Sequence, residues 1–169
     1  VAYRVGSRNE RTGQTGISHW LEHMMFKGTP KYEQGELDRL IDRAGGQWNA
    51  FTSMDHTMYY ETLPADQIDL ALDAEADRMM NAMFDPEETE SERTVVISER
   101  RDNENSPTFW LNEEVRAAAF RVHGYHHAII GDMTDLYSMT RDDLIGHYAD
   151  YYRPSNAVAV AVGDFDTDE

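Results

Sequence analysis

Two histidines and a glutamate lie within a short stretch near the start of the sequence. His19 and His23 are four positions apart, and Glu22 immediately precedes the second histidine. On an α-helix, residues four apart differ by about 40° in direction and about 6 Å in height, so both imidazoles can reach one metal ion. Glu22 would lie close to the same face, where its carboxylate can accept a proton from a metal-bound water. The pattern indicates a catalytic metal site, in inverted order relative to the commoner His-Glu-x-x-His.

A catalytic zinc site usually has three protein ligands and one open position, so another element must supply the third ligand. The segment that follows Asp85 carries several acidic candidates, including Glu88, Glu92, Glu99 and Glu104. Glu92 and Glu99 are two helical turns apart and share one face, and we expect the intervening Val95 and Val96 to turn that face toward the interior. A carboxylate on a buried face needs a partner, and a metal ion is one.

Glu92 and Glu99 cannot easily bind the same ion, because two helical turns separate them by roughly 10 Å. One of them can bind the metal while the other orients a ligand imidazole. The spacing alone leaves another interpretation open, since histidines four apart on a helix also occur as surface or core residues with ordinary hydrogen bonds.

The composition limits the kind of site. The 169 residues include no cysteine, so disulfides, thiolate chemistry and sulfur-ligated metals are excluded, and a metal ion must use histidine and carboxylate ligands. The formal net charge of −17 argues against binding to a nucleic acid, whose affinity depends on Lys and Arg. The acidity is compatible with attraction of basic peptides and with solubility alone.

Length and hydrophobic content predict a folded unit. A hydrophobic content of 40% over 169 residues is enough for a substantial core in one domain. No run approaches the roughly 18 apolar residues needed to cross a bilayer, so we expect a soluble chain without a signal or transmembrane segment, and its compartment stays open. By its length, the chain of residues 1–169 is interpreted as a single domain. Because it begins at Val1 without an initiator Met, it is also interpreted as a fragment of a longer multi-domain chain.

The motif needs a helix, and a polar loop over residues 7–15 leads into one over residues 17–26. Its large apolar side chains are expected to pack against the core: Trp20, Met24, Met25 and Phe26. A second helix is expected over residues 36–44, ended by Gly45 and Gly46. Aromatic and β-branched residues then predict a hairpin with strands over residues 48–52 and 56–63.

The rest of the chain is expected to be mainly helical. A helix over residues 64–83 has an apolar stripe expected to face the core: Ile68, Leu72, Ala76, Met79, Met80 and Met83. Asp85 and Pro86 predict the start of the next helix, which runs to about Glu104, and Pro107 allows a further start. A capping box at Thr140 opens a helix that ends near Tyr152.

Short strands over residues 2–6 and 157–162 complete the expected elements. Strands mixed with helices, without regular alternation, predict an α+β fold, with a mainly antiparallel sheet and helices packed on one face.

Several segments carry a more specific pattern. The chain contains Gly6–Glu10 followed by Gly16–Thr29, then Gly45–Thr52, Glu92–Glu99, Ile130–Gly131, Tyr152–Ala157 and Val162–Asp164. In these segments, which extend over nearly its whole length, the chain closely resembles the family of pitrilysin, insulin-degrading enzyme and mitochondrial processing peptidase.

The resemblance implies a zinc metalloendopeptidase of the mitochondrial processing peptidase-like fold, with one zinc ion per chain. It assigns His19, His23 and Glu99 as metal ligands, Glu22 as the general base that activates a zinc-bound water, and Glu92 as a supporting glutamate. These assignments agree with the pairing of residues argued from helical geometry.

The resemblance also implies a mode of substrate binding, in which a peptide adds as a strand to an exposed sheet edge near the zinc. Asn49, Ala50 and Phe51 match that edge, although Phe51 also fits an ordinary core position. His126 and His127 are interpreted as part of a solvated polar loop. The family pairs this domain with further domains or a homologous subunit, so the expected partners are these and a peptide or unfolded polypeptide substrate.

Two other functions fit parts of the pattern. Some family members have lost the motif and serve as scaffolds or partner subunits, but His19, Glu22, His23 and Glu99 are intact here. S-ribosylhomocysteine lyase uses a related fold and an inverted motif with a cysteine ligand, and this chain has none. Peptide hydrolysis is therefore the favoured interpretation.

Overall fold

The computed structural model describes residues 1–165, and within them helices outnumber strands. The elements are, in chain order, β1 (Ala2–Tyr3), η1 (Ser7–Asn9), α1 (Ile17–Met24), α2 (Glu36–Arg43), β2 (Gln47–Thr52), β3 (Thr57–Thr62), η2 (Ala65–Gln67), α3 (Ile68–Asn81), α4 (Pro86–Glu104), α5 (Pro107–Ala119), η3 (Gly124–His126), α6 (Met133–Ser138), α7 (Arg141–Tyr151), η4 (Pro154–Asn156) and β4 (Ala157–Val158).

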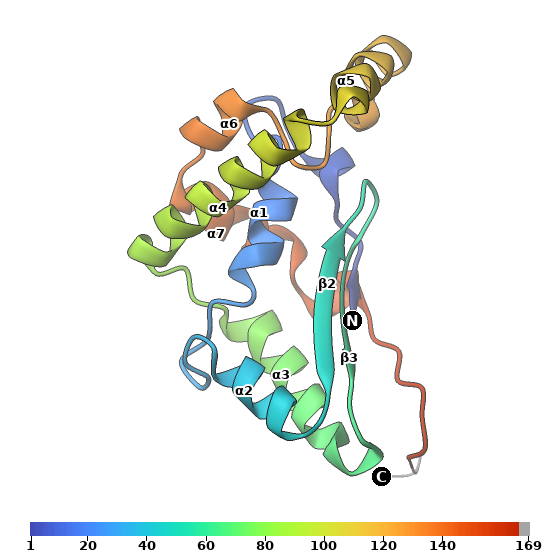
Figure 1. Ribbon diagram of the computed structural model, residues 1–169. Helices are drawn as coiled ribbons and strands as arrows, with labels where there is room; N and C mark the ends of the chain where they lie inside the picture. The colour runs from blue at the N-terminus through green and yellow to red at the C-terminus, as the bar shows by residue number, and fades with distance from the viewer. Residues whose placement is uncertain (166–169) are drawn as a thin grey trace.

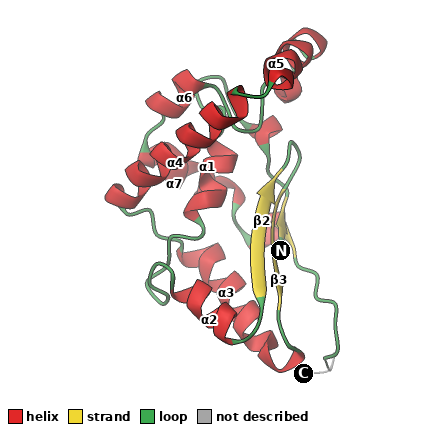
Figure 2. Ribbon diagram, viewed as in Figure 1, coloured by secondary structure: helices red, strands yellow, loops and turns green. Residues whose placement is uncertain are grey.

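The strands form one antiparallel sheet in the order β2-β3-β1-β4. Strand β2 is therefore an edge of this sheet. Figure 1 shows α1, α2, α3 and α4 on one side of the β2–β3 hairpin, and Figure 2 separates the layer of helices from the strands by colour. The α+β fold with helices on one face of an antiparallel sheet is confirmed.

The hairpin forms where aromatic and β-branched residues predicted it. Asn49 is opposite Tyr60 and Thr52 is opposite Thr57. In the turn, the backbone N–H of Ser53 donates to the carbonyl of His56 at 2.8 Å. Helix α2 ends as expected, because Gly45 adopts the left-handed conformation with φ of 77°, which other residues rarely adopt.

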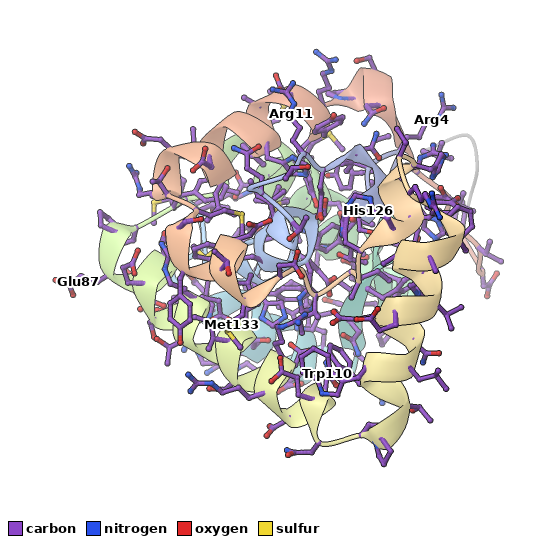
Figure 3. All side chains as sticks on the ribbon, turned by 90° about the horizontal axis from the view of Figure 1, so that it is seen from above. Arg4, Arg11, Glu87, Trp110, His126 and Met133 are labelled. Carbon is purple, nitrogen blue, oxygen red and sulfur yellow. The ribbon has the colours of Figure 1, made fainter. Side chains whose placement is uncertain are left out.

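The core lies between the sheet and the motif helix α1. Trp20, Leu21 and Met24 of this helix are fully buried in the same core cluster as Tyr3 and Tyr59 of the sheet. Viewed from above, α1 lies in the middle of the molecule, ringed by the helices of the later part of the chain (Figure 3). The packing role predicted for Trp20, Met24 and Met25 is confirmed, while Phe26 is only partly buried beside the core.

Most of the apolar stripe predicted for α3 does not face the core, and of its residues only Met79 packs against the core cluster. Leu72 and Met80 are 57% and 64% exposed, and the buried positions are Ala74, Glu75 and Arg78. Arg78 can occupy the interior because it forms ion pairs with Glu75 and with Glu61 of β3, the latter at 2.7 Å. On the buried face of α3, the structure thus has a cluster of paired charges where apolar side chains were expected.

The outer strands are shorter than expected, since β1 has two residues and β4 ends at Val158, whereas strands were expected over residues 2–6 and 157–162. On α4, Val96 is buried but Val95 is exposed, so the expectation for Val95 was wrong. No helix within residues 1–165 combines the length and the apolar character required for a membrane span.

Candidate metal centre

Three side chains from two helices converge on one point. The Nε2 atoms of His19 and His23 are 3.3 Å apart. The Oε2 atom of Glu99, on α4, lies 3.7 Å from Nε2 of His19 and 3.6 Å from Nε2 of His23. These residues form a group whose ligand atoms all lie within 4.8 Å of one another.

The geometry of this group fits a zinc ion. Zinc bound tetrahedrally to N and O atoms at about 2.0–2.2 Å holds its ligand atoms roughly 3.3–3.6 Å apart. The measured separations of 3.3, 3.6 and 3.7 Å agree with that value. Two imidazoles and one carboxylate are also the donor set of a catalytic zinc site, which leaves a fourth position open.

The surroundings of the two histidines shift their pKa values in opposite directions. Burial, together with the nearby His23, lowers the pKa of His19 to about 4, so its imidazole is neutral at pH 7 as a ligand must be. For His23, burial acts to lower the pKa, but the hydrogen bond with Glu92 and the surrounding carboxylates outweigh it and raise the pKa. A metal ion therefore competes with a proton more strongly at His23 than at His19.

Glu92 contacts His23 rather than the converging ligand atoms. Nδ1 of His23 donates to Oε1 of Glu92 at 2.8 Å, which leaves Nε2 of the same ring directed at the ligand cluster. Burial acts to raise the pKa of Glu92, but hydrogen bonds from His23 and Lys27 outweigh it and lower the pKa. An ionised carboxylate behind a ligand imidazole is the usual support for a metal-binding histidine.

Glu22 is held next to the cluster by the sheet. The hydroxyl of Thr52, at the end of β2, donates to Oε2 of Glu22 at 2.5 Å. Burial raises the pKa of Glu22, and the hydrogen bond from Thr52 partly offsets this effect. A carboxylate with a raised pKa, fixed in place beside a metal site, is suited to accept a proton near neutral pH.

The start of α1 is fixed by a carboxylate from the preceding loop. Both oxygens of the buried Glu10 accept backbone N–H groups, from Gly16 at 2.8 Å and from Ser18 at 2.9 Å. Gly16 has φ of 89°, and a Cβ there would lie 2.5 Å from the carbonyl of Ile130. The helix that carries both histidines therefore begins at one defined position.

A cleft of about 400 Å³ lies beside the ligand cluster. Ala50, Phe51 and Thr52 of β2 line one part of it, and the segment 128–130 lines another. Phe51 is 42% exposed, so it is not a core side chain. Asn49 lies on the same edge strand but not in the lining of the cleft, and its Oδ1 accepts the backbone N–H of Ala50 at 2.8 Å.

A larger cavity, of about 600 Å³, lies elsewhere between α3 and residues 159–165. Its walls are mainly apolar and include Leu63, Ile68 and Leu72. The smaller cleft is the candidate active site, because His19, Glu22 and Glu99 line it.

Four residues at or near the site were not predicted from the sequence: Glu10, Lys27, Thr52 and His147. Thr52 shares the inward-facing side of β2 with Ala50, so strand alternation was a usable signal for it. His147 of α7 contacts Ser18 of α1 with its Nε2 at 3.1 Å, a pairing of distant segments that no local pattern reveals. The solvated position expected for His127 was wrong, because its ring is buried and its Nδ1 contacts the carbonyl of Ala128 at 3.0 Å.

Comparison with family models gives two matches. The model described as insulinase, peptidase family M16, matches residues 1–133, and the model described as the peptidase M16 inactive domain matches residues 138–169. Together they extend over nearly the whole sequence.

Individual relatives are named as proteases. The zinc protease PqqE of Helicobacter pylori is 39% identical over 165 residues, which are 97% of this chain and 37% of that protein. The uncharacterized zinc protease YmxG of Bacillus subtilis is 36% identical over 160 residues, 95% of this chain and 39% of that protein. A probable mitochondrial-processing peptidase subunit beta of Arabidopsis thaliana is 33% identical over 94% of this chain and 30% of that protein. The chain thus spans about two fifths or less of the length of these relatives.

Solved structures share the fold. The crystal structure of a protease from Helicobacter pylori matches 92% of this chain and 38% of its own, with a TM-score of 0.89 and 38% identity. The periplasmic protease PqqL from Escherichia coli matches 92% of this chain and 18% of its own, with a TM-score of 0.82 at 23% identity, which shows the likeness of fold alone.

Proposed function

The chain belongs to the insulinase family of peptidases, family M16, and from this membership and the geometry of the site we propose that it carries the catalytic centre of a zinc metalloendopeptidase. His19, His23 and Glu99 would hold one zinc ion. The observation that supports this most strongly is the convergence of three metal-binding atoms within 3.3 to 3.7 Å of one another, next to the glutamate Glu22.

Each residue of the proposed centre has a separate task. A zinc ion, when bound, supplies the Lewis acidity that polarises the scissile carbonyl and lowers the pKa of water. Glu22 is the general base: it accepts the proton of the attacking water and passes it to the departing amine. Thr52 would orient the carboxylate of Glu22 for this proton transfer through the 2.5 Å hydrogen bond to Oε2.

The substrate that fits this site is an extended peptide. Strand β2 is an edge of the described sheet and lines the cleft, so a peptide can add to it through backbone hydrogen bonds. Ala50 and Phe51 would contact the peptide near the scissile bond, and Asn49 would contact it further along the strand. Most backbone groups of a folded protein are already hydrogen-bonded within it, which favours unfolded polypeptides as substrates.

The proposal is tested with an unstructured fluorogenic peptide, zinc and the Glu22→Gln variant. Because relatives are longer, both this chain and the full-length protein that contains it are assayed. We expect the wild-type site to cleave the peptide and Glu22→Gln to lose about 10²–10⁴-fold in rate while it keeps its zinc.

Two outcomes contradict the proposal in different ways. Equal cleavage by the wild type and Glu22→Gln would remove Glu22 from the mechanism. Zinc binding without any cleavage by the full-length protein would favour the alternative function, a non-catalytic scaffold or partner subunit.

A further inference from the structure

The supporting glutamate of the metal centre has a second partner. Oε1 of Glu92 accepts from Nδ1 of His23 at 2.8 Å, and Oε2 of the same carboxylate lies 2.5 Å from Nζ of Lys27. The side chain of Glu92 is only 7% exposed and that of Lys27 22%. Lys27, Glu92 and His23 therefore form a continuous chain of side-chain contacts that ends at a proposed zinc ligand.

The backbone holds Lys27 in place for this contact. Lys27 is four residues after His23 and follows the end of α1, and its N–H donates to the carbonyl of Met24 at 3.0 Å in a turn. On the other side, the carbonyl of Gly28 accepts the N–H of Met83 at 3.0 Å. Both His23 and Lys27 thus contact Glu92 on α4.

A carboxylate with one buried partner can rotate or take up a proton, whereas one with two partners keeps a fixed orientation and its charge. The contact with Lys27 fixes Oε2, so Oε1 remains directed at the imidazole of His23. The imidazole in turn keeps Nε2 directed at the ligand cluster.

We propose that Lys27 is a positioning residue of the metal centre, acting on His23 through Glu92. This inference rests on the zinc site proposed above and adds to it a residue that does not contact the ligand cluster. A Lys27 that only joins α1 to α4 would contribute to stability and leave the zinc affinity of the folded chain unchanged.

The positive charge of Lys27 has an opposing effect on a bound cation, because like charges repel. Glu92 lies 2.5 Å from Lys27 and offsets its charge, so the loss of positioning should be the larger effect. Partners of ligand residues typically contribute about 10–100-fold to metal affinity. For Lys27→Met we expect the lower end, a zinc affinity about 10-fold weaker.

The test measures zinc affinity by competition with a chromogenic chelator, in Lys27→Met, Lys27→Arg and Lys27→Gln. The sequence offers a matched control, because Lys31 is its only other lysine and forms an ion pair with Asp73 at 2.5 Å, among exposed side chains. We expect Lys31→Met to change zinc affinity less than twofold and Lys27→Arg to retain most of the wild-type affinity. Thermal unfolding without zinc shows which variants are folded, and Lys27→Gln replaces Lys27→Met if that variant is not.

A double-mutant cycle with Glu92→Gln separates positioning from charge. In the Glu92→Gln background, Lys27 acts on the metal only through repulsion between its positive charge and the zinc ion. Lys27→Met should therefore leave the zinc affinity unchanged or strengthen it in this background, whereas the same replacement in the wild type should weaken the zinc affinity. An equal weakening in both backgrounds, or no weakening in the wild type, would overturn the inference while the zinc site stands. A wild-type chain that binds no zinc would overturn both.

Discussion

The buried pair of Ser18 and His147 makes a quantitative prediction about acid stability. Nε2 of His147 lies 3.1 Å from Oγ of Ser18, and both side chains are buried between α1 and α7. Burial lowers the pKa of His147 from 6.5 to about 4, because the interior disfavours the imidazolium form. We expect the replacement His147→Gln to change how stability depends on pH.

The direction follows from which state binds the proton. Between pH 6.5 and about 4 the unfolded chain protonates His147 and the folded chain does not, so stability falls as the pH falls. The full effect is on the order of 3 kcal/mol, present above pH 6.5 and lost once the pH is below about 4. At pH 7 the variant should be about 1 kcal/mol less stable than the wild type through the altered hydrogen bond.

Urea unfolding at several pH values between 7 and 4, with a chelator present, measures this effect. His56→Gln is a matched control, because Nδ1 of His56 also lies 3.1 Å from a serine hydroxyl, that of Ser53, but in a turn that is only half-buried. The wild type and His56→Gln should lose about 3 kcal/mol more than His147→Gln over this range. Parallel curves for the wild type and His147→Gln would refute the reasoning that burial suppresses the charge of His147.

Three further predictions concern the base, the core and the metal. The hydrogen bond from the hydroxyl of Thr52 lowers the pKa of Glu22, so Thr52→Val should raise this pKa and move the acid limb of the pH profile of kcat/KM to higher pH. Thr52→Ser keeps the hydroxyl and should leave the acid limb in place. An acid limb that does not move in Thr52→Val would contradict this prediction. Arg78→Leu should cost about 3–5 kcal/mol in urea unfolding, because it leaves Glu61 and Glu75 buried without their cation, and a cost below about 1 kcal/mol would show that the cluster is not buried as described. When free zinc is present at 100 times its Kd for the chain, its removal should lower the free energy of unfolding by about 2.7 kcal/mol and Tm by roughly 5–10 °C. An unchanged Tm would argue against zinc binding to the folded state.

Local geometry explains why much of the candidate site was predictable. His19 and His23 are placed by a single helix, whose repeat fixes their separation before any tertiary contact forms. The third ligand was not determined by spacing, since several glutamates fitted, and it needed the family resemblance to single out Glu99. In the structure Glu99 converges with both histidines and Glu92 contacts His23, while their roles at a metal ion stay a prediction.

The expectations that failed depend on contacts between distant segments. Apart from Met79, the apolar stripe of α3 predicted the wrong face. Arg78 is buried there because it pairs with Glu75 and with Glu61 from β3 and lies over the ring of Tyr59, and a helical repeat does not show the contacts with the strand. His127 looked like a loop residue but is buried near Glu10, with 3.7 Å between Nδ1 and Oε2. The hairpin and the helix caps were predicted well, because turn and capping residues act within a few positions.

The zinc content of the purified chain tests the central claim most directly. Elemental analysis after dialysis against trace zinc at pH 7 should give about one zinc per chain for the wild type and much less for Glu99→Gln, which keeps the shape of the side chain but removes the charged ligand. Glu104→Gln, on the same helix and without contact to the histidines, serves as the control and should retain the zinc. Equal zinc content in the wild type and Glu99→Gln, or none in the wild type, would contradict the proposal that His19, His23 and Glu99 form a metal site.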